Sequence, residues 1–330
     1  MIILTMIKKL IKVVCFGGGA VVPERVMDPL KKSGKFLVCG VTSMIDNGGS
    51  TGQLREDFRI LPPGDIRRHL IVLSDAPAWK KKLWKFRFGR EEFPGGHKGH
   101  SFANVFVGGL EYVLKDYSKA LKIVHEFLEI KDHTALPATI DKVQVCATLE
   151  DGTKIVGEDE IDVPKLHDPE KRIIDVYLSS NAKVYPETKQ WIEKADVLIF
   201  GPGDLFSSII PCLLAQDVKN TIIKSKAKKI AISSTMQKLG ETNNFSVLDF
   251  TKEIEKYIGC DLDGVIYNTG LISKDKLDLY KKENPSLVAP LIIDKNLSEG
   301  KFVGLDLLKG DSEMEHDPQK VFNSLIKMIK

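Results

Sequence analysis

Short runs of apolar residues, each the length of a β-strand, alternate along most of this chain with longer stretches of helical character. The runs of strand character are Lys12 to Phe16, Phe36 to Thr42, Val197 to Phe200, Lys229 to Ser233 and Gly264 to Tyr267. Parallel strands are buried on both faces and need crossover helices between them, so this alternation is typical of a helix-covered parallel sheet. The sequence therefore predicts an α/β fold with a doubly wound, mainly parallel sheet.

The middle of the chain has the pattern of a β-hairpin. Lys142 to Leu149 and Thr153 to Glu158 are rich in strand-forming residues, and they flank a turn that contains Asp151-Gly152. We therefore expect one nucleotide-binding domain over 1–330, with a small β-rich insertion at about 136–185. The region 271–330 is lysine-rich and predicted to be helical, with an amphipathic helix from Pro318 to Lys330 at its end.

Composition excludes several classes of protein. With 330 residues, of which 43% are hydrophobic and 28% charged, the chain can bury a large core. A net charge of +3 gives no overall field that would recruit nucleic acid or a membrane surface. The five cysteines form no close pair, which fits a reducing cytoplasm. Lys8, Lys9 and Lys12 interrupt the apolar amino terminus, so we expect neither a membrane span nor a signal peptide.

Glycine-rich segments follow two of the predicted strands, at the ends where open α/β sheets bind ligands. Gly17-Gly18-Gly19 allows the backbone to approach an anion closely, although a tight strand-to-helix turn is the plain alternative. Gly201-Pro202-Gly203-Asp204, followed by Ser207 and Ser208, predicts a phosphate loop without a Walker lysine. Because hydride-transfer and ATP-hydrolysis fingerprints are absent, we expect no nicotinamide or flavin cofactor.

A third loop combines one carboxylate, two hydroxyls and several glycines in the run Asp46-Asn47-Gly48-Gly49-Ser50-Thr51-Gly52. Such a loop can form an amide nest for phosphate while Asp46 faces Mg²⁺ or a hydroxyl group. A surface turn is the alternative. Further along, Asp65 begins a predicted helix and Arg67 can hold a phosphate through its guanidinium group. For that helix the alternative is a capped start with solvated charges.

A predicted helix begins near His100, Ser101 and Asn104, whose side chains and free amides can meet an anion or a sugar. Capping by Ser101 is compatible with that role. A metal pair of His97 and His100 is an alternative for which the spacing suggests no third ligand. The predicted apolar face of this helix consists of Phe102, Val105, Phe106, Leu110 and Val113.

Aromatic residues alternate with lysines and arginines from Trp79 to Arg90, a pattern found in proteins that bind single-stranded nucleic acid. An amphipathic helix with a solvated basic face has the same pattern. We favour that helix over nucleic-acid binding because the whole chain is almost neutral.

Five segments, taken together, resemble the CofD/YvcK family: 46–55, 62–68, 99–104, 201–211 and 236–242. One branch of that family contains phospholactate transferases of coenzyme F420 synthesis. The other contains YvcK-type proteins, called gluconeogenesis factors, which bind UDP-sugars and support cell-wall, cell-shape and carbon homeostasis. The run Asp46 to Gly52, the turn Pro63 to Arg67 and His316-Asp317-Pro318 look like the YvcK branch. Ala20-Val21, Asn47 and Gln237-Lys238-Leu239 differ from the usual family pattern.

The resemblance implies a Rossmann-like core that binds a nucleotide diphosphate or nucleotide-sugar. Its phosphates would lie over Gly17 to Gly19 and Gly201 to Ser208, with Asp46 and Asn104 near the pyrophosphate or sugar. The leading expectation is a regulatory protein that binds a UDP-sugar. The alternative is a metal-dependent transferase resembling 2-phospho-L-lactate transferase, in which a catalytic Asp46 holds Mg²⁺ and the donor is of the guanosine diphosphate type. The base, the sugar and the formation of a homo-oligomer stay open.

Overall fold

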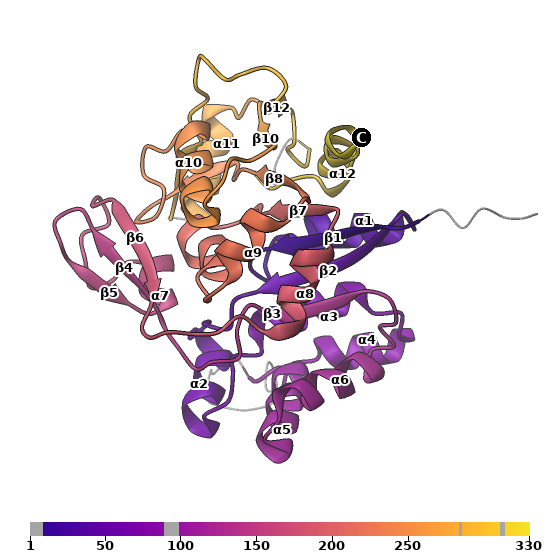
Figure 1. The fold of residues 1–330 in the computed structure, drawn as a ribbon. Coiled ribbons are helices and arrows are strands. Elements are labelled where there is room, and N and C mark those ends of the chain that lie inside the picture. The colour runs from indigo at the N-terminus through magenta and orange to yellow at the C-terminus, as the bar shows by residue number, and fades with distance from the viewer. Residues whose placement is uncertain (1–8, 89–98, 284–285, 311–313) are drawn as a thin grey trace, which may run out of the picture.

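A parallel sheet of seven strands forms the centre of the protein (Figure 1). The computed structural model describes residues 9–88, 99–283, 286–310 and 314–330. The strand order is β12-β10-β8-β7-β1-β2-β3, and every neighbouring pair is parallel. The fold is thus the predicted Rossmann-like α/β fold. The seven strands are β1 (Ile11–Phe16), β2 (Phe36–Thr42), β3 (Thr134–Pro137), β7 (Val197–Phe200), β8 (Lys228–Ile232), β10 (Gly264–Asn268) and β12 (Phe302–Leu305).

The sequence predicts five of these strands, β1, β2, β7, β8 and β10, because their residues are buried on both faces of the sheet. In β1, the four residues from Val13 to Phe16 have no exposed surface. The Phe16 ring stacks on Phe200 of β7 with 5.1 Å between ring centroids. A strand covered on both faces must be apolar at every position, and this continuous run is what the sequence shows.

Helices cover both faces of the sheet (Figure 1). On one face, α1, α3 and α12 pack around a π-helical turn at Pro23–Met27, and on the other α9 lies between α8 and α10. A further group, α4 to α6, lies beside α3. The bounds are α1 (Asp28–Lys32), α2 (Gly49–Phe58), α3 (Gly64–Leu73), α4 (Ala78–Lys85), α5 (Phe102–Leu114), α6 (Tyr117–Phe127), α8 (Pro186–Lys194), α9 (Val218–Lys224), α10 (Val247–Ile258), α11 (Lys274–Glu283) and α12 (Pro318–Ile329).

The predicted β-hairpin is present in a small antiparallel sheet that projects from the side of the molecule (Figure 1). This insertion contains β4 (Val145–Leu149), β5 (Lys154–Val156), the short helix α7 (Glu158–Asp162) and β6 (Ile173–Leu178). Its strand order is β5-β4-β6. The expected start at residue 136 is too early, because residues 136 and 137 belong to β3 of the central sheet.

The region 271–330 is not purely helical, which corrects the prediction. Besides α11 and α12 it contains β11 (Leu287–Pro290), which pairs with β9 (Met236–Lys238), and the edge strand β12. All four residues of β12 are only partly buried. A short, half-exposed strand that contains Gly304 carries little of the apolar signal that identifies the central strands.

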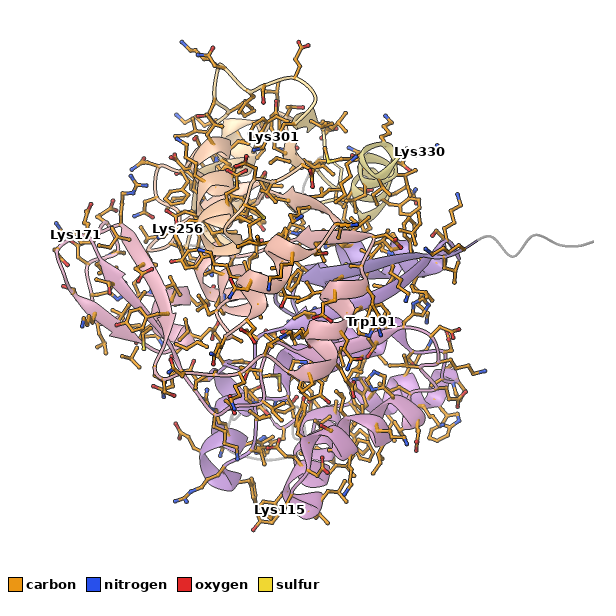
Figure 2. The ribbon with its side chains drawn as sticks, viewed as in Figure 1. Lys115, Lys171, Trp191, Lys256, Lys301 and Lys330 are labelled. Carbon is orange, nitrogen blue, oxygen red and sulfur yellow. The ribbon has the colours of Figure 1, made fainter. Side chains whose placement is uncertain are left out.

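The basic and aromatic segment forms α4 as far as Lys85. Trp84 is fully buried and donates its indole N–H to the Arg67 carbonyl at 3.0 Å, whereas Trp79 on the same helix is 62% exposed. Other lysines, such as Lys115 and Lys171, lie far apart on the periphery of the molecule (Figure 2). Within the described ranges, no helix has both the length and the hydropathy needed to cross a bilayer.

Candidate functional site

A cleft of about 920 Å³ opens at the carboxyl ends of β1, β2 and β7. β1 lies between β2 and β7, at the point where the order of the strands reverses direction, and open α/β sheets bind ligands at this point. Most of the predicted site residues line the cleft: Gly19, Asp46, Gly48, Gly49, Ser50, Thr51, Asp65, Arg67, Asn104, Asp204, Ser207 and Ser208.

The other predicted residues do not line the cleft but stand next to it in sequence or in space. Gly203 lines a smaller, adjoining hollow. The other predicted site residues that do not line the cleft are Gly17, Gly18, Asn47, His100, Ser101, Gly201 and Pro202. His97 lies outside the described residues, so the alternative of a His97 and His100 metal pair does too.

The three glycines after β1 are required by close packing beneath the cleft. A Cβ atom on Gly18 would lie 2.7 Å from the Ser208 hydroxyl, and one on Gly19 would lie 2.8 Å from the Asp65 Cα. Real Cβ atoms do not approach a backbone atom as closely as one on Gly19 would, so a side chain is excluded at Gly19. The glycines therefore let this loop lie directly against both α3 and the segment after β7.

Two carboxyl groups lie in the cleft, that of Asp46 in the loop after β2 and that of Asp65 in the first turn of α3. Asp46 accepts a hydrogen bond from the Gly48 amide at 2.9 Å, and a Cβ on Gly64 would lie 2.3 Å from the other carboxylate oxygen of Asp46. Burial raises the pKa of Asp46, and the negative charge of Asp65 raises it further. Burial also raises the pKa of Asp65. Both carboxyl groups are therefore more basic than exposed aspartates.

The start of α5 presents Asn104 to the cleft. Ser101 caps the helix by accepting a hydrogen bond from the Asn104 amide at 3.1 Å. The Asn104 side chain donates to the hydroxyls of Ser50 at 3.2 Å and Thr51 at 3.4 Å. Its carbonyl oxygen is buried and has no hydrogen-bond partner among the described residues. The His100 Nδ1 atom is 2.9 Å from the Ser50 hydroxyl, so His100 contacts the loop after β2 without lining the cleft.

The loop after β7 differs from a phosphate loop in one respect that the sequence does not show. Two amides at the helix start after Asp204, those of Phe206 and Ser207, donate to Glu241 at 2.8 and 3.1 Å. The Ser207 hydroxyl donates to the other oxygen of Glu241 at 2.8 Å. A carboxylate of the protein thus occupies the position at the helix start that we expected a phosphate to occupy.

The insertion contributes one wall of the cleft, which sequence reasoning missed. Glu158, Asp159 and Asp162 of α7 all line it. Asn47 and Asp159 exchange two hydrogen bonds of 2.6 and 3.1 Å, and these join α7 to the loop after β2. Burial and then the charges of nearby carboxylates raise the pKa of Glu158 to about 9. No local signal identifies these residues, because an acidic helical turn is usually solvated.

Cations face the same cleft. Arg67, Arg68 and Arg87 line it together with Lys238, and of these only Arg67 is a predicted site residue. Burial and the other two guanidinium groups lower the pKa of Arg67 to about 10, which leaves it charged at neutral pH. The Arg67 Nε is buried and has no hydrogen-bond partner within the described part of the chain. The guanidinium group is therefore available to an anionic ligand.

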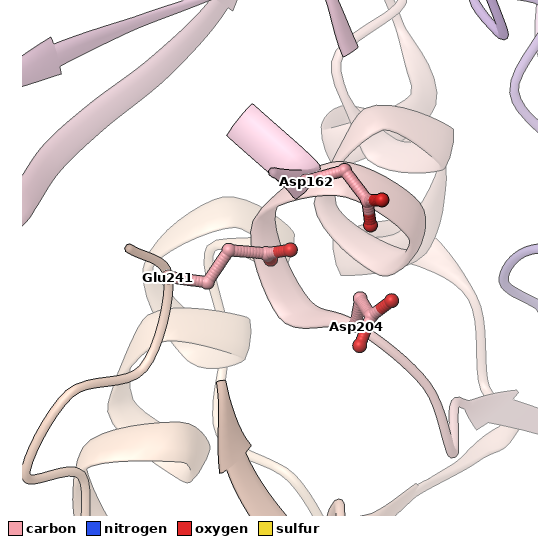
Figure 3. A group of neighbouring side chains, drawn as sticks. All are labelled: Asp162, Asp204 and Glu241. Carbon is pink, nitrogen blue, oxygen red and sulfur yellow. The ribbon is translucent and has the colours of Figure 1, made fainter. Parts of the chain in front are cut away.

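Lys238 lies among Asp162, Asp204 and Glu241, whose side chains point toward one another (Figure 3). Burial lowers the pKa of Lys238, but the three carboxylates outweigh burial and raise it well above its ordinary value. The predicted metal ligand Asp46 is not part of this group.

Comparison with known proteins identifies the family of this chain. A family model described as 2-phospho-L-lactate transferase CofD matches residues 13–303. The chain belongs to the CofD family. Over 94% of its length it is 36% identical to a Thermotoga maritima protein provisionally named as a gluconeogenesis factor, of which 96% is covered. The gluconeogenesis factor of Bacillus subtilis is 30% identical, with 97% of this chain and 98% of that protein covered.

A solved structure of the same fold is that of a UPF0052 family member from Bacillus halodurans. It superimposes with a TM-score of 0.85 and 28% sequence identity, over 96% of this chain and 99% of that one. The expected resemblance to the CofD/YvcK family and the Rossmann-like fold are thus both confirmed.

Proposed function

We propose that this CofD family member binds a nucleotide-sugar, with a UDP-sugar as the ligand, and acts as a regulator of the gluconeogenesis-factor type. The observation that carries the proposal is one cleft lined by two chemically different sets of residues. Arg67, Arg68 and Arg87 supply positive charge, whereas Asn104 and the carboxyl groups of α7 supply hydrogen-bonding groups. A nucleotide-sugar needs both, because it joins a dianionic diphosphate to a ring of hydroxyl groups.

The diphosphate fits the three arginines that line the cleft. A guanidinium group can donate two parallel hydrogen bonds to a phosphate, and the Arg67 Nε has no partner among the described residues. Gly19 and Ser208 lie on the floor of the cleft, where the loop after β1 has no side chain to keep a phosphate away. The phosphates therefore lie over Gly19 and Ser208, and Arg67 binds them from α3.

The sugar fits Asn104 and the acidic residues of α7. The buried Asn104 carbonyl oxygen needs a donor, and a sugar hydroxyl provides one. Burial and nearby carboxylates raise the pKa of Glu158 to about 9, so at neutral pH its carboxyl group is protonated and can donate a hydrogen bond to a sugar oxygen. Asp159 accepts hydrogen bonds. A wall that offers donors and acceptors side by side suits a ligand whose hydroxyl groups do both.

The base fits a smaller hollow that shares Ala20 and Asp204 with the main cleft. Its volume is about 180 Å³, which is enough for a single nucleobase. Val21, Met236 and Leu287 give it apolar walls for a planar ring. Because the two spaces share residues, one extended ligand can occupy both.

The residues also fit the Mg²⁺ ion that we expect. Mg²⁺ in nucleotide sites is usually held by one or two carboxylates together with the phosphates of the ligand. Asp46 and Asp65 would hold it here, and the ion would neutralise part of the diphosphate charge. Asp46 would then orient the loop after β2, through its bond to the Gly48 amide, toward the phosphates.

Calorimetric titration with UDP-glucose, with GDP and NAD in parallel, tests the proposal. We expect heat of binding with UDP-glucose, and we expect Arg67→Ala to weaken the affinity at least about tenfold, which is about 1.4 kcal/mol. Arg172→Ala is the control, because Arg172 is exposed and lies in the insertion away from the cleft. Absence of heat with every UDP-sugar tried would remove the proposal.

A second candidate function is favoured by the description of the family model, a phospholactate transferase. In such a reaction an acceptor hydroxyl forms a bond to the phosphorus that carries the acid. The bond from that phosphorus to the nucleotide breaks, and a nucleoside monophosphate leaves. Asp46 would hold the Mg²⁺ ion, which would supply positive charge to the phosphoryl group and the leaving nucleotide.

Asp46→Asn separates the two functions. If the protein is a transferase, turnover of a guanosine diphosphate-type donor with a deazaflavin acceptor requires a divalent metal and falls at least about a hundredfold in this variant, while nucleotide binding persists. Donor consumption is measured by chromatography. If wild-type protein consumes no donor with any deazaflavin acceptor, the transferase function is excluded.

A further inference from the structure

A lysine is buried among three carboxyl groups beside the cleft. The carboxylate oxygens of Asp162, Asp204 and Glu241 lie within 4.8 Å of one another (Figure 3). Oxygen atoms at such spacing commonly surround a divalent cation. The Lys238 ammonium group contacts all three: it is 2.8 Å from Asp204 and 3.2 Å from Glu241, and it donates a hydrogen bond to Asp162.

The burial of Lys238 and Glu241 makes the charge balance of this group important. Lys238 is 7% exposed and Glu241 is 2% exposed, whereas the side chains of Asp162 and Asp204 are 35% and 39% exposed. A buried charge is tolerated only when it is paired and hydrogen-bonded, and removal of one partner leaves the others uncompensated. Without Lys238, three carboxylates would face one another with no cation between them.

We propose that the Lys238 ammonium is the resident cation of this cluster and occupies the position that a divalent metal ion takes in comparable carboxylate sites. It follows that the wild-type protein binds no divalent ion at Asp162, Asp204 and Glu241. A neutral side chain at position 238 turns the same three carboxylates into a divalent-cation site.

The three carboxylates belong to elements that are far apart in the sequence. Asp162 ends α7 of the insertion, Asp204 follows β7, and Glu241 follows β9. Glu241 also accepts the hydrogen bonds from the Phe206 and Ser207 amides. Lys238 therefore joins the insertion to the floor of the cleft and is a positioning residue for the wall that α7 forms.

The test uses Mn²⁺ alone, so its result does not depend on the ligand of the cleft. Wild-type protein, Lys238→Gln and the cation-retaining control Lys238→Arg are freed of metal with EDTA and titrated with Mn²⁺, and bound ion is measured by electron paramagnetic resonance. We expect Lys238→Gln to bind one more Mn²⁺ ion per chain than the wild type, and Lys238→Arg to bind no more. The added ion should raise the melting temperature of Lys238→Gln only.

Two further variants locate the ion. Adding Asp204→Asn to Lys238→Gln should abolish the extra binding, and Asp204→Asn alone should leave the Mn²⁺ stoichiometry of the otherwise wild-type protein unchanged. The proposal is overturned if Lys238→Gln gains no ion. It is equally overturned if Asp204→Asn alone removes a bound Mn²⁺. This second measurement can be made even when Lys238→Gln does not fold.

Discussion

Burial and neighbouring carboxylates change the protonation state of Glu158. Asp162, Asp46, Asp65 and Glu241 are all near enough to raise its pKa, and burial raises it more than any of them, to about 9. No hydrogen bond or ion pair joins the Glu158 side chain to another described residue. A carboxyl group in this state is neutral at pH 7 and can serve as a hydrogen-bond donor in the cleft.

The raised pKa of Glu158 predicts a pH-dependent stability. Between its ordinary pKa of 4.5 and about 9, folded Glu158 keeps a proton that the unfolded chain has lost, so the free energy of unfolding falls as pH rises. Glu158→Gln removes this loss. In calorimetric scans at pH 6, 7.5 and 9, we expect the melting temperature of the variant to exceed that of the wild type by about 2–4 °C at pH 9.

The matched control for this prediction is Glu56→Gln on α2, because Glu56 is exposed. Its melting temperature should follow that of the wild type across the same range of pH. Parallel curves for Glu158→Gln and the wild type would show that Glu158 is ionised in the folded protein at neutral pH.

At the scale of a single element, α5 shows what a local pattern can and cannot predict. The start of the helix and its Ser101 cap follow from the sequence and are present. The predicted apolar face is right in part: Phe106 and Leu110 pack against the core, whereas Val105 is 43% exposed and Val113 is 76% exposed. The most deeply buried side of the helix also contains Ala103, Asn104 and Val107. The buried side therefore includes a polar residue, Asn104, that lines the cleft.

The Ser101 cap gives a prediction that belongs to this element. Ser101→Ala removes the acceptor for the Asn104 amide, so we expect a loss of about 1 kcal/mol in the free energy of unfolding. Because Asn104 lies in the same turn, UDP-glucose should also bind more weakly. Urea unfolding and calorimetric titration measure the two effects.

Ser246→Ala serves as the control, because Ser246 caps α10 by accepting a hydrogen bond from the Asp249 amide at 3.2 Å and does not line the cleft. It should lose similar stability while the affinity for UDP-glucose stays unchanged. Equal weakening of binding in both variants would mean that stability alone, and not the position of Asn104, controls the affinity.

At the scale of the whole molecule, the order of the strands assembles the site. β1 pairs with β2 on one side and with β7 on the other, so loops that are far apart in the sequence, such as those with Gly18 and Ser208, meet at the carboxyl ends of the strands. The insertion then folds back, and α7 closes the cleft with residues that follow a hairpin. One sheet edge thereby combines arginines from α3 with carboxylates from α7.

The sequence by itself determined the five central strands, the β-hairpin, the cap of α5 and most of the loops that line the cleft. These features depend on short-range physics: continuous burial, backbone freedom at glycine and hydrogen bonds within one helical turn. The tertiary structure alone decided that α7 faces the cleft, that Lys238 lies among three carboxylates and that Glu241 accepts hydrogen bonds from two backbone amides. Asn47 and Asp159 are separated by 112 residues, and Lys238 and Asp204 by 34. Such pairs form only after the sheet has brought its strand ends together, so no local pattern records them.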